Sequence, residues 1–129
     1  MKPKTKTLYR PIGQKELDFL IQNEFRAWPP RLPEQPIFYP VTNEDYAVQI
    51  ARDWNTKDKI NGNVGYVTVF EVDEIFLSQF PEKTVGARLH TEHWIPAERL
   101  DEFNEHIVGK IRPIRKFIPQ GEVSLNDLN

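Results

Sequence analysis

The chain has 129 residues, no cysteine and 39% hydrophobic residues. This length fits one domain with a single core, and the composition excludes a disordered chain. The lack of cysteine excludes disulfides and thiolate metal sites, and no apolar run approaches the roughly 18 residues of a membrane span. A formal net charge of −2 gives no overall attraction to nucleic acid or anionic lipid. We therefore expect a single cytoplasmic domain over residues 1–129, with no membrane partner.

The first 36 residues predict a strand, a helix and a loop. A strand over residues 7–10 stops at Pro11, and Gly13 opens a helical pattern with an apolar face formed by Leu17, Leu20 and Ile21. Residues 28–36 read WPPRLPEQP, and four prolines in nine residues prevent regular hydrogen bonding. This loop is stiff, so it is either the wall of a pocket or a rigid connector.

A short strand over 36–41 leads into the helix that the sequence predicts most clearly. Thr42 is the expected N-cap, with Asp45 three residues later, and the helix ends near Asn55. Its apolar stripe consists of Ala47, Ile50, Ala51 and Trp54. The polar stretch over 57–63 that follows, with Asn-Gly near its end, predicts a turn.

The second half of the chain predicts mostly strands. Residues 65–72 have apolar positions on both faces, which indicates a central strand. A helical turn over 73–80 and a strand over 84–93 are expected next. A helix then runs from Pro96 to Gly109, with Leu100, Phe103 and Ile107 facing inward. The chain ends with an edge strand over 110–118 and a mobile tail over 119–129. This order fits an α+β domain with a split, mixed or antiparallel sheet and two or three helices. Neither G-x-G-x-x-G nor a P-loop occurs, so a Rossmann-type NAD site is not expected.

Three segments carry the residues that suggest a chemistry. The first is Leu8-Tyr9-Arg10, the second is Ile37-Phe38-Tyr39 with the helix that contains Tyr46, and the third is the run from His90 through Glu92 to Glu98. An arginine offers a planar fork of donors for phosphate and ribose oxygens. A glutamate in an otherwise apolar strand is unfavourable to bury without a partner, which suggests a specific role for Glu92. His90 and Glu92 are two residues apart, so both project to the same face of a strand.

In order and spacing, these segments resemble the small ADP-ribosyltransferase family, and also small bacterial proteins labelled ADP-ribosylation/crystallin J1. The resemblance implies an ADP-ribosyltransferase-like fold that binds NAD in a cleft of a split sheet. It implies that Arg10 anchors the dinucleotide, that Tyr39 and Tyr46 frame the nicotinamide, and that Glu92 is catalytic. It also implies cofactor-binding positions at Tyr9 and Asn43.

The implied function is NAD-dependent transfer of ADP-ribose to an unidentified protein or nucleic-acid acceptor, with release of nicotinamide. Glu92 would stabilise the cationic, oxocarbenium-like sugar as nicotinamide leaves. His90 departs from the Glu or Gln of the family at this position, so it would act on the acceptor side, as a base for an unusual acceptor.

Several alternatives stay open. In the alternative interpretation, Arg10 is a surface residue at a strand end, and Tyr39 and Tyr46 are packing residues. Two alternative functions are a non-catalytic nucleotide- or protein-binding module and a transferase acting on RNA 2′-phosphate. No metal is expected, because H-E-x-x-H spacing is absent and His90 and His93 fall on opposite faces of a strand.

Overall fold

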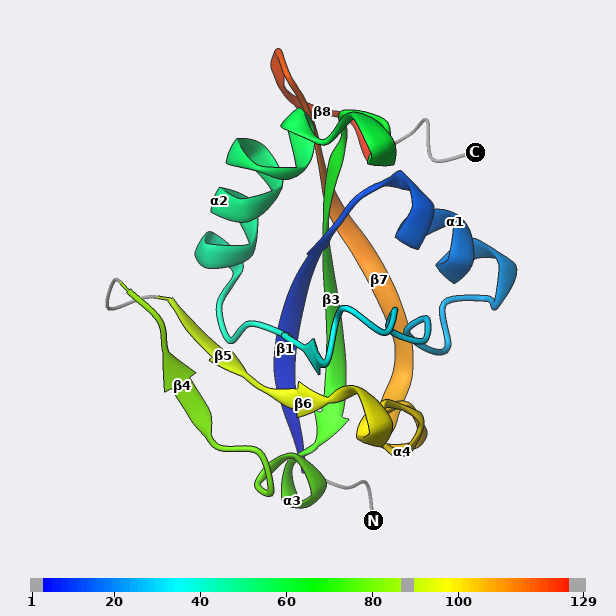
Figure 1. Cartoon of the computed structure of the whole chain (residues 1–129), viewed down its shortest axis with the longest axis vertical. Helices are drawn as coiled ribbons and strands as arrows, with labels where there is room; N and C mark the ends of the chain where they lie inside the picture. Colours follow the sequence, from blue (N-terminus) through cyan, green and yellow to red (C-terminus); the bar gives the residue numbers. More distant parts are fainter. Residues whose placement is uncertain (1–3, 87–89, 126–129) are drawn as a thin grey trace.

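A computed structural model describes residues 4–86 and 90–125, and it shows a mixed α+β fold built on antiparallel sheets (Figure 1). The main sheet has the order β1-β3-β7-β8, in which all neighbours are antiparallel. Its strands are β1 (Thr5–Ile12), β3 (Gly65–Asp73), β7 (Ile107–Ile118) and β8 (Gly121–Val123). The inner position of β3 confirms the prediction of a central strand over 65–72, although β1 continues through Pro11.

A second ladder of short strands lies beside β1 (Figure 1). It consists of β2 (Ile37–Phe38) paired with β6 (Ile95–Pro96), and β4 (Glu82–Thr84) paired with β5 (Thr91–His93). Val41 joins the two parts, because it bridges Tyr9 of β1 on one side and Glu92 of β5 on the other. Residues 37–42 and 91–96 keep one antiparallel register throughout. Among the described residues, Val41 alone of the second ladder pairs with β1, so the ladder separates from the main sheet on either side of Val41.

Four α-helices cover the main sheet on both faces: α1 (Gln14–Gln22), α2 (Glu44–Asp53), α3 (Glu74–Leu77) and α4 (Leu100–Glu105). Single 3₁₀ turns are η1 (Asn55–Lys57), η2 (Lys59–Asn61) and η3 (Ala97–Arg99). The larger apolar cluster contains Leu8, Trp28 and Phe70 and lies on the side of α1, α3 and α4. The smaller one contains Ala47 and Val67 and lies under α2. Both faces of β3 are thus buried, as its sequence indicated.

Helix α2 begins and ends differently from the prediction. The N-cap is Asn43 and not Thr42, because the Asn43 Oδ1 accepts a hydrogen bond of 2.8 Å from the backbone N–H of Tyr46. Trp54 lies after the last helical residue and is 69% exposed, so it does not complete the predicted apolar stripe. The helix packs closely on β3, since a Cβ at Gly65 would meet the carbonyl oxygen of Ala51 at 2.4 Å.

Three further predictions need correction. The expected strand over 84–93 covers only Thr84 of β4 and all of β5, which are two separate strands paired with each other, and its residues 87–89 lie outside the described residues. The last helix ends at Glu105, and Gly109 lies inside β7 with a φ of +82°, near an irregularity in the register with β3. The expected mobile tail contains β8, which pairs with the end of β7, while 126–129 lie outside the described residues.

Strand β7 was predicted as an edge strand. On its outer side only its last residues pair with another strand, while the backbone N–H of Ile111 donates to the Phe25 carbonyl. β8 pairs with residues 116–118 alone, so most of β7 has no strand beyond it in the described part of the chain. Among the described residues, no helix is long and apolar enough to span a bilayer.

Candidate functional site

Arg10 lies on the face of β1 that also carries Leu8 and Ile12, at the place where the sheet splits. Its guanidinium lies 4.6 Å from the ring centroid of Phe38 and forms a two-point ion pair with Glu16 of α1. Nε donates to Oε2 at 2.6 Å, and Nη2 donates to Oε1 at 3.1 Å. Nη1 makes no hydrogen bond with any residue in the described part of the chain. The guanidinium is therefore held in one orientation, with donors left for a ligand.

Glu92 of β5 is buried, with 8% of its surface exposed, and both of its carboxylate oxygens accept a hydrogen bond. The indole Nε1 of Trp94 donates to Oε1 at 2.9 Å, and the hydroxyl of Tyr46 donates to Oε2 at 3.2 Å. Trp94 follows Glu92 by two residues, so strand alternation places both side chains on the same face. The carboxylate is thus fixed by two neutral donors and carries no ion pair with a described residue.

Tyr46 links Glu92 to His90. The phenol ring of Tyr46 stacks on the imidazole of His90, with centroids 4.4 Å apart and planes at 13°. His90 Nε2 lies 2.9 Å from the side-chain oxygen of Gln49. Burial, followed by the charge of Glu92 and the hydrogen bond to it, raises the pKa of Tyr46 above its usual value. Tyr46 therefore stays a hydrogen-bond donor to Glu92 at neutral pH.

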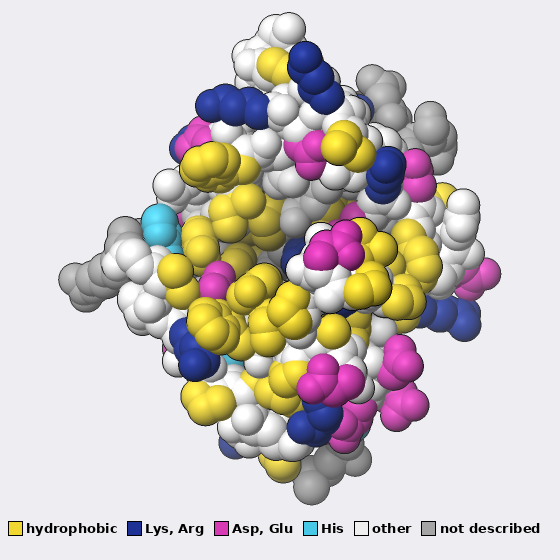
Figure 2. All heavy atoms as spheres, viewed as in Figure 1, with side chains coloured by type: hydrophobic (Ala, Val, Ile, Leu, Met, Phe, Trp, Pro, Cys, Tyr) yellow, Lys and Arg dark blue, Asp and Glu magenta, His cyan; other side chains and the backbone are white. Residues whose placement is uncertain are grey.

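A cavity of about 300 Å³ opens between these groups, and we call it the first cavity. It brings together one residue from each of the three segments that the sequence singled out: Arg10, Tyr39 and Glu92. The remaining residues of its lining are Pro11, Val41, Ile50 and Asn55. Tyr39 and Trp94 meet edge to face at its rim, with centroids 5.8 Å apart, and each is 38% exposed. Figure 2 shows this side of the molecule hollowed between hydrophobic side chains.

The structure does not bring every predicted residue into the first cavity. Tyr9 points to the opposite face of β1, where it packs against the cluster under α2. Asn43 uses its side-chain oxygen to cap α2. Tyr46 and His90 are absent from the lining, and the Tyr46 hydroxyl donates to Glu92 from outside the cavity. Tyr46 therefore orients a carboxylate in this structure, whereas the resemblance implied contact with nicotinamide.

Some residues of the site have weak or no sequence signals. Glu16 and Asn55 belong to elements whose placement beside Arg10 depends on the tertiary fold. The alternation of Glu92 and Trp94 was readable, but no pattern indicates that the indole donates to the carboxylate.

His93 lies on the other face of β5 from Glu92, as alternation requires, and belongs to a different environment. It is buried, with Nδ1 2.5 Å from the carbonyl oxygen of Phe80 and Nε2 3.1 Å from Lys6 Nζ. Burial lowers the pKa of His93 below its usual value, and the cation of Lys6 adds to this effect, while the hydrogen bond to Phe80 and the charge of Glu82 oppose it. No group of three or more His, Asp or Glu side chains among the described residues has a geometry that would hold a metal ion.

The chain was also compared with known proteins. No protein-family model, no curated protein and no solved structure matches it. The geometry of the cleft therefore carries the functional inference.

Proposed function

We propose that this chain has an ADP-ribosyltransferase-like fold, binds NAD at the split of the sheet, and transfers its ADP-ribose to a protein or nucleic-acid acceptor. One observation carries the proposal: Arg10, Tyr39 and Glu92, from three separate segments, line the same cavity. Each is the type of residue that one part of the reaction needs. These are a phosphate-binding guanidinium, an exposed aromatic ring and a fixed carboxylate.

The chemical step breaks the bond between ribose C1′ and the nicotinamide nitrogen. The bonding electron pair leaves with nicotinamide, which departs as a neutral molecule, and positive charge develops on the sugar. Glu92 offers a negative charge that needs no reorientation during the reaction, because Trp94 and Tyr46 already hold its two oxygens. The acceptor then forms the new bond to C1′ and loses its proton. We propose that the imidazole of His90, which stacks on Tyr46 outside the lining of the first cavity, takes up this proton.

The test is nicotinamide release from NAD by the wild-type chain and by Glu92→Gln, with and without cell lysate. Glu92→Gln keeps the size of the side chain and removes the charge, so release should fall by about 10²-fold or more. Glu98→Gln, an exposed carboxylate on η3, is the control and should be as active as the wild type. Equal release by wild type and Glu92→Gln would remove Glu92 from the mechanism. Dependence on lysate separates transfer from hydrolysis of NAD.

A second candidate is a binding module without catalysis, and the hydrogen bonds of Glu92 favour it. Both oxygens are occupied by donors of the protein, which also suits a purely structural carboxylate. NAD binding detected by calorimetry, together with no nicotinamide release under any condition, would identify this module.

A further inference from the structure

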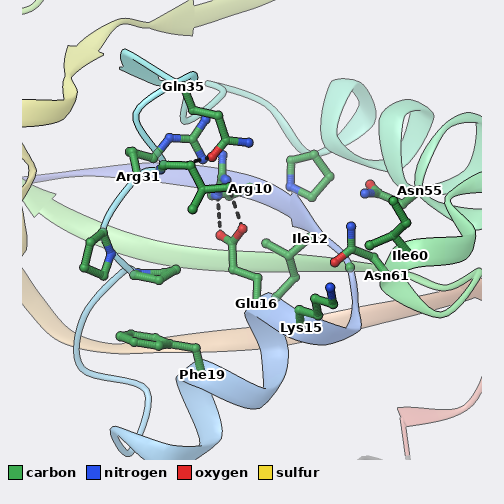
Figure 3. Close-up of a pocket in the computed structure, with 15 residues that line it drawn as sticks. Arg10, Ile12, Lys15, Glu16, Phe19, Arg31, Gln35, Asn55, Ile60 and Asn61 are labelled. Atoms are coloured by element: carbon green, nitrogen blue, oxygen red, sulfur yellow. Dashed lines mark hydrogen bonds and ion pairs between the residues drawn. The ribbon is translucent and has the colours of Figure 1, made fainter.

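A second cavity, of about 520 Å³, adjoins the first one and shares Arg10, Pro11 and Asn55 with it (Figure 3). One wall is the proline-rich loop of residues 28–36, which contributes Arg31. In Figure 3, Arg31 and Gln35 lie on one side of the opening, while Asn55 and Asn61 lie on the other. This volume is within the range of small-molecule sites, about 300–1,000 Å³.

The loop that forms this wall is anchored to the core. The backbone N–H of Trp28 donates to Asn104 Oδ1 at 2.9 Å, and Asn104 Nδ2 donates back to the Trp28 carbonyl at 3.1 Å. The ring of Trp28 is buried against Phe38 and Phe70. Arg31 is therefore carried by a loop that is fixed at its start and restrained by its prolines.

The charges around the second cavity do not cancel. Arg10, Lys15 and Arg31 line it, and Glu16 is its single acidic residue. Both oxygens of Glu16 accept from Arg10, and no ion pair of Arg31 exists among the described residues. Burial, and then the neighbouring Arg10, lower the pKa of Arg31 below its usual value. An anion in this cavity would relieve the repulsion between the two guanidinium groups.

Two polar atoms in the lining are buried with no hydrogen-bond partner among the residues that the structure describes: Arg31 Nε and Asn55 Oδ1. An unpaired buried polar atom destabilises the folded state, so such atoms are rare in folded proteins. Arg31 Nε is a donor, and it needs an acceptor such as a phosphate oxygen. Asn55 Oδ1 is an acceptor, and it needs a hydroxyl or amino group. A nucleoside phosphate carries both kinds of group.

We infer that the second cavity binds the phosphorylated part of a nucleotide, with Arg31 donating to phosphate and Asn55 accepting from a ribose hydroxyl or a base amino group. The site stands on the lining of this cavity alone. When the ligand is NAD, as the proposed function requires, its adenosine phosphate half occupies the second cavity and its nicotinamide riboside half occupies the first. The shared Arg10 then lies at the diphosphate.

The test is calorimetric titration of AMP, nicotinamide riboside and inorganic pyrophosphate into the wild type, Arg31→Gln and Asn55→Ala. AMP should bind the wild type, and each of the two substitutions should weaken the affinity for AMP by about 10- to 100-fold at fixed salt. Nicotinamide riboside has no phosphate, so Arg31→Gln should leave its affinity unchanged. Arg26→Gln is the matched control, because Arg26 is exposed and pairs with exposed Glu24. Circular dichroism checks that each variant is folded.

Two results would overturn the inference: AMP that does not bind the folded wild type at millimolar concentration, or AMP that binds Arg31→Gln as tightly as the wild type. Pyrophosphate that binds as tightly as AMP would overturn the role of Asn55. AMP binding that depends on Arg31, without nicotinamide release, would support this site and reject the proposed reaction. Nicotinamide release that is unaffected by Arg31→Gln would support the proposed reaction and reject this site.

Discussion

The carboxylate of Glu92 and the imidazole of His93 are neighbours in sequence, but the alternation of β5 places them in two different chemical environments. Glu92 faces the first cavity, and His93 faces the carbonyl of buried Phe80 and the partly exposed ion pair of Lys6 and Glu82. Alternation could be read from the sequence, and so could the candidates Arg10, Tyr39 and Glu92. The partners of these side chains could not be read, because Glu16 and Tyr46 come from helices whose packing is decided by the whole core.

The burial of His93 predicts a pH dependence of stability. Its folded-state pKa lies below the unfolded value of about 6.5, so the unfolded chain takes up this proton first as the pH falls. The free energy of unfolding should therefore be highest above the unfolded pKa and should decrease as the pH falls from there through the folded pKa.

Urea unfolding between about pH 8 and pH 5 measures this decrease. His93→Gln keeps a donor for the Phe80 carbonyl and an acceptor for Lys6 but does not titrate, so its slope should be smaller than that of the wild type. His106, on the surface near α4, gives the control variant His106→Gln. Identical slopes for wild type and His93→Gln would contradict the prediction.

Among the elements, β3 and α2 were the easiest to predict, because their apolar patterns are long and belong to the core. The short elements around the split were predicted less well. The expected strand over 84–93 overlaps β4 and β5, which pair with each other and have three residues each, too few for a periodic signal. Gly109 was expected to end a helix, but its positive φ serves an irregularity inside β7. A single glycine carries no information on which of these uses applies.

The contact between α2 and β3 predicts a strong effect of Gly65→Ala. The new methyl group would lie 2.4 Å from the carbonyl oxygen of Ala51, so the helix must move away from the sheet. We expect a loss of about 1–3 kcal/mol in the free energy of unfolding, measured by urea denaturation. Gly109→Ala, where the methyl meets no atom within 4 Å but φ is positive, reports backbone strain alone. An unchanged stability of Gly65→Ala would show that α2 does not pack this closely.

For the whole molecule, one apolar cluster connects the main sheet with the second ladder. It contains Phe70 of β3, Phe38 of β2 and Ile95 of β6, together with Trp28 of the loop. The sequence predicted one α+β domain with a split sheet, and the described residues confirm the mixed composition and the antiparallel pairing. Where the sheet splits could not be predicted, because it depends on the single bridge at Val41.

This shared cluster predicts that the two ladders unfold together. Far-ultraviolet circular dichroism follows mainly the backbone, and tryptophan emission follows the exposure of buried Trp28. Both should give the same midpoint in urea. Two separate midpoints would show that the second ladder, which carries Glu92, unfolds as an independent unit.

Four of the nine residues over 28–36 are prolines, which have no backbone hydrogen to exchange with deuterated solvent. Of the other amides, those of Trp28 and Gln35 already donate to Asn104 and to the Leu32 carbonyl. A ligand held against this wall therefore changes few exchange rates on it. Its footprint in amide exchange should fall on the opposite wall, over η1 and η2, where Asn55 and Asn61 lie.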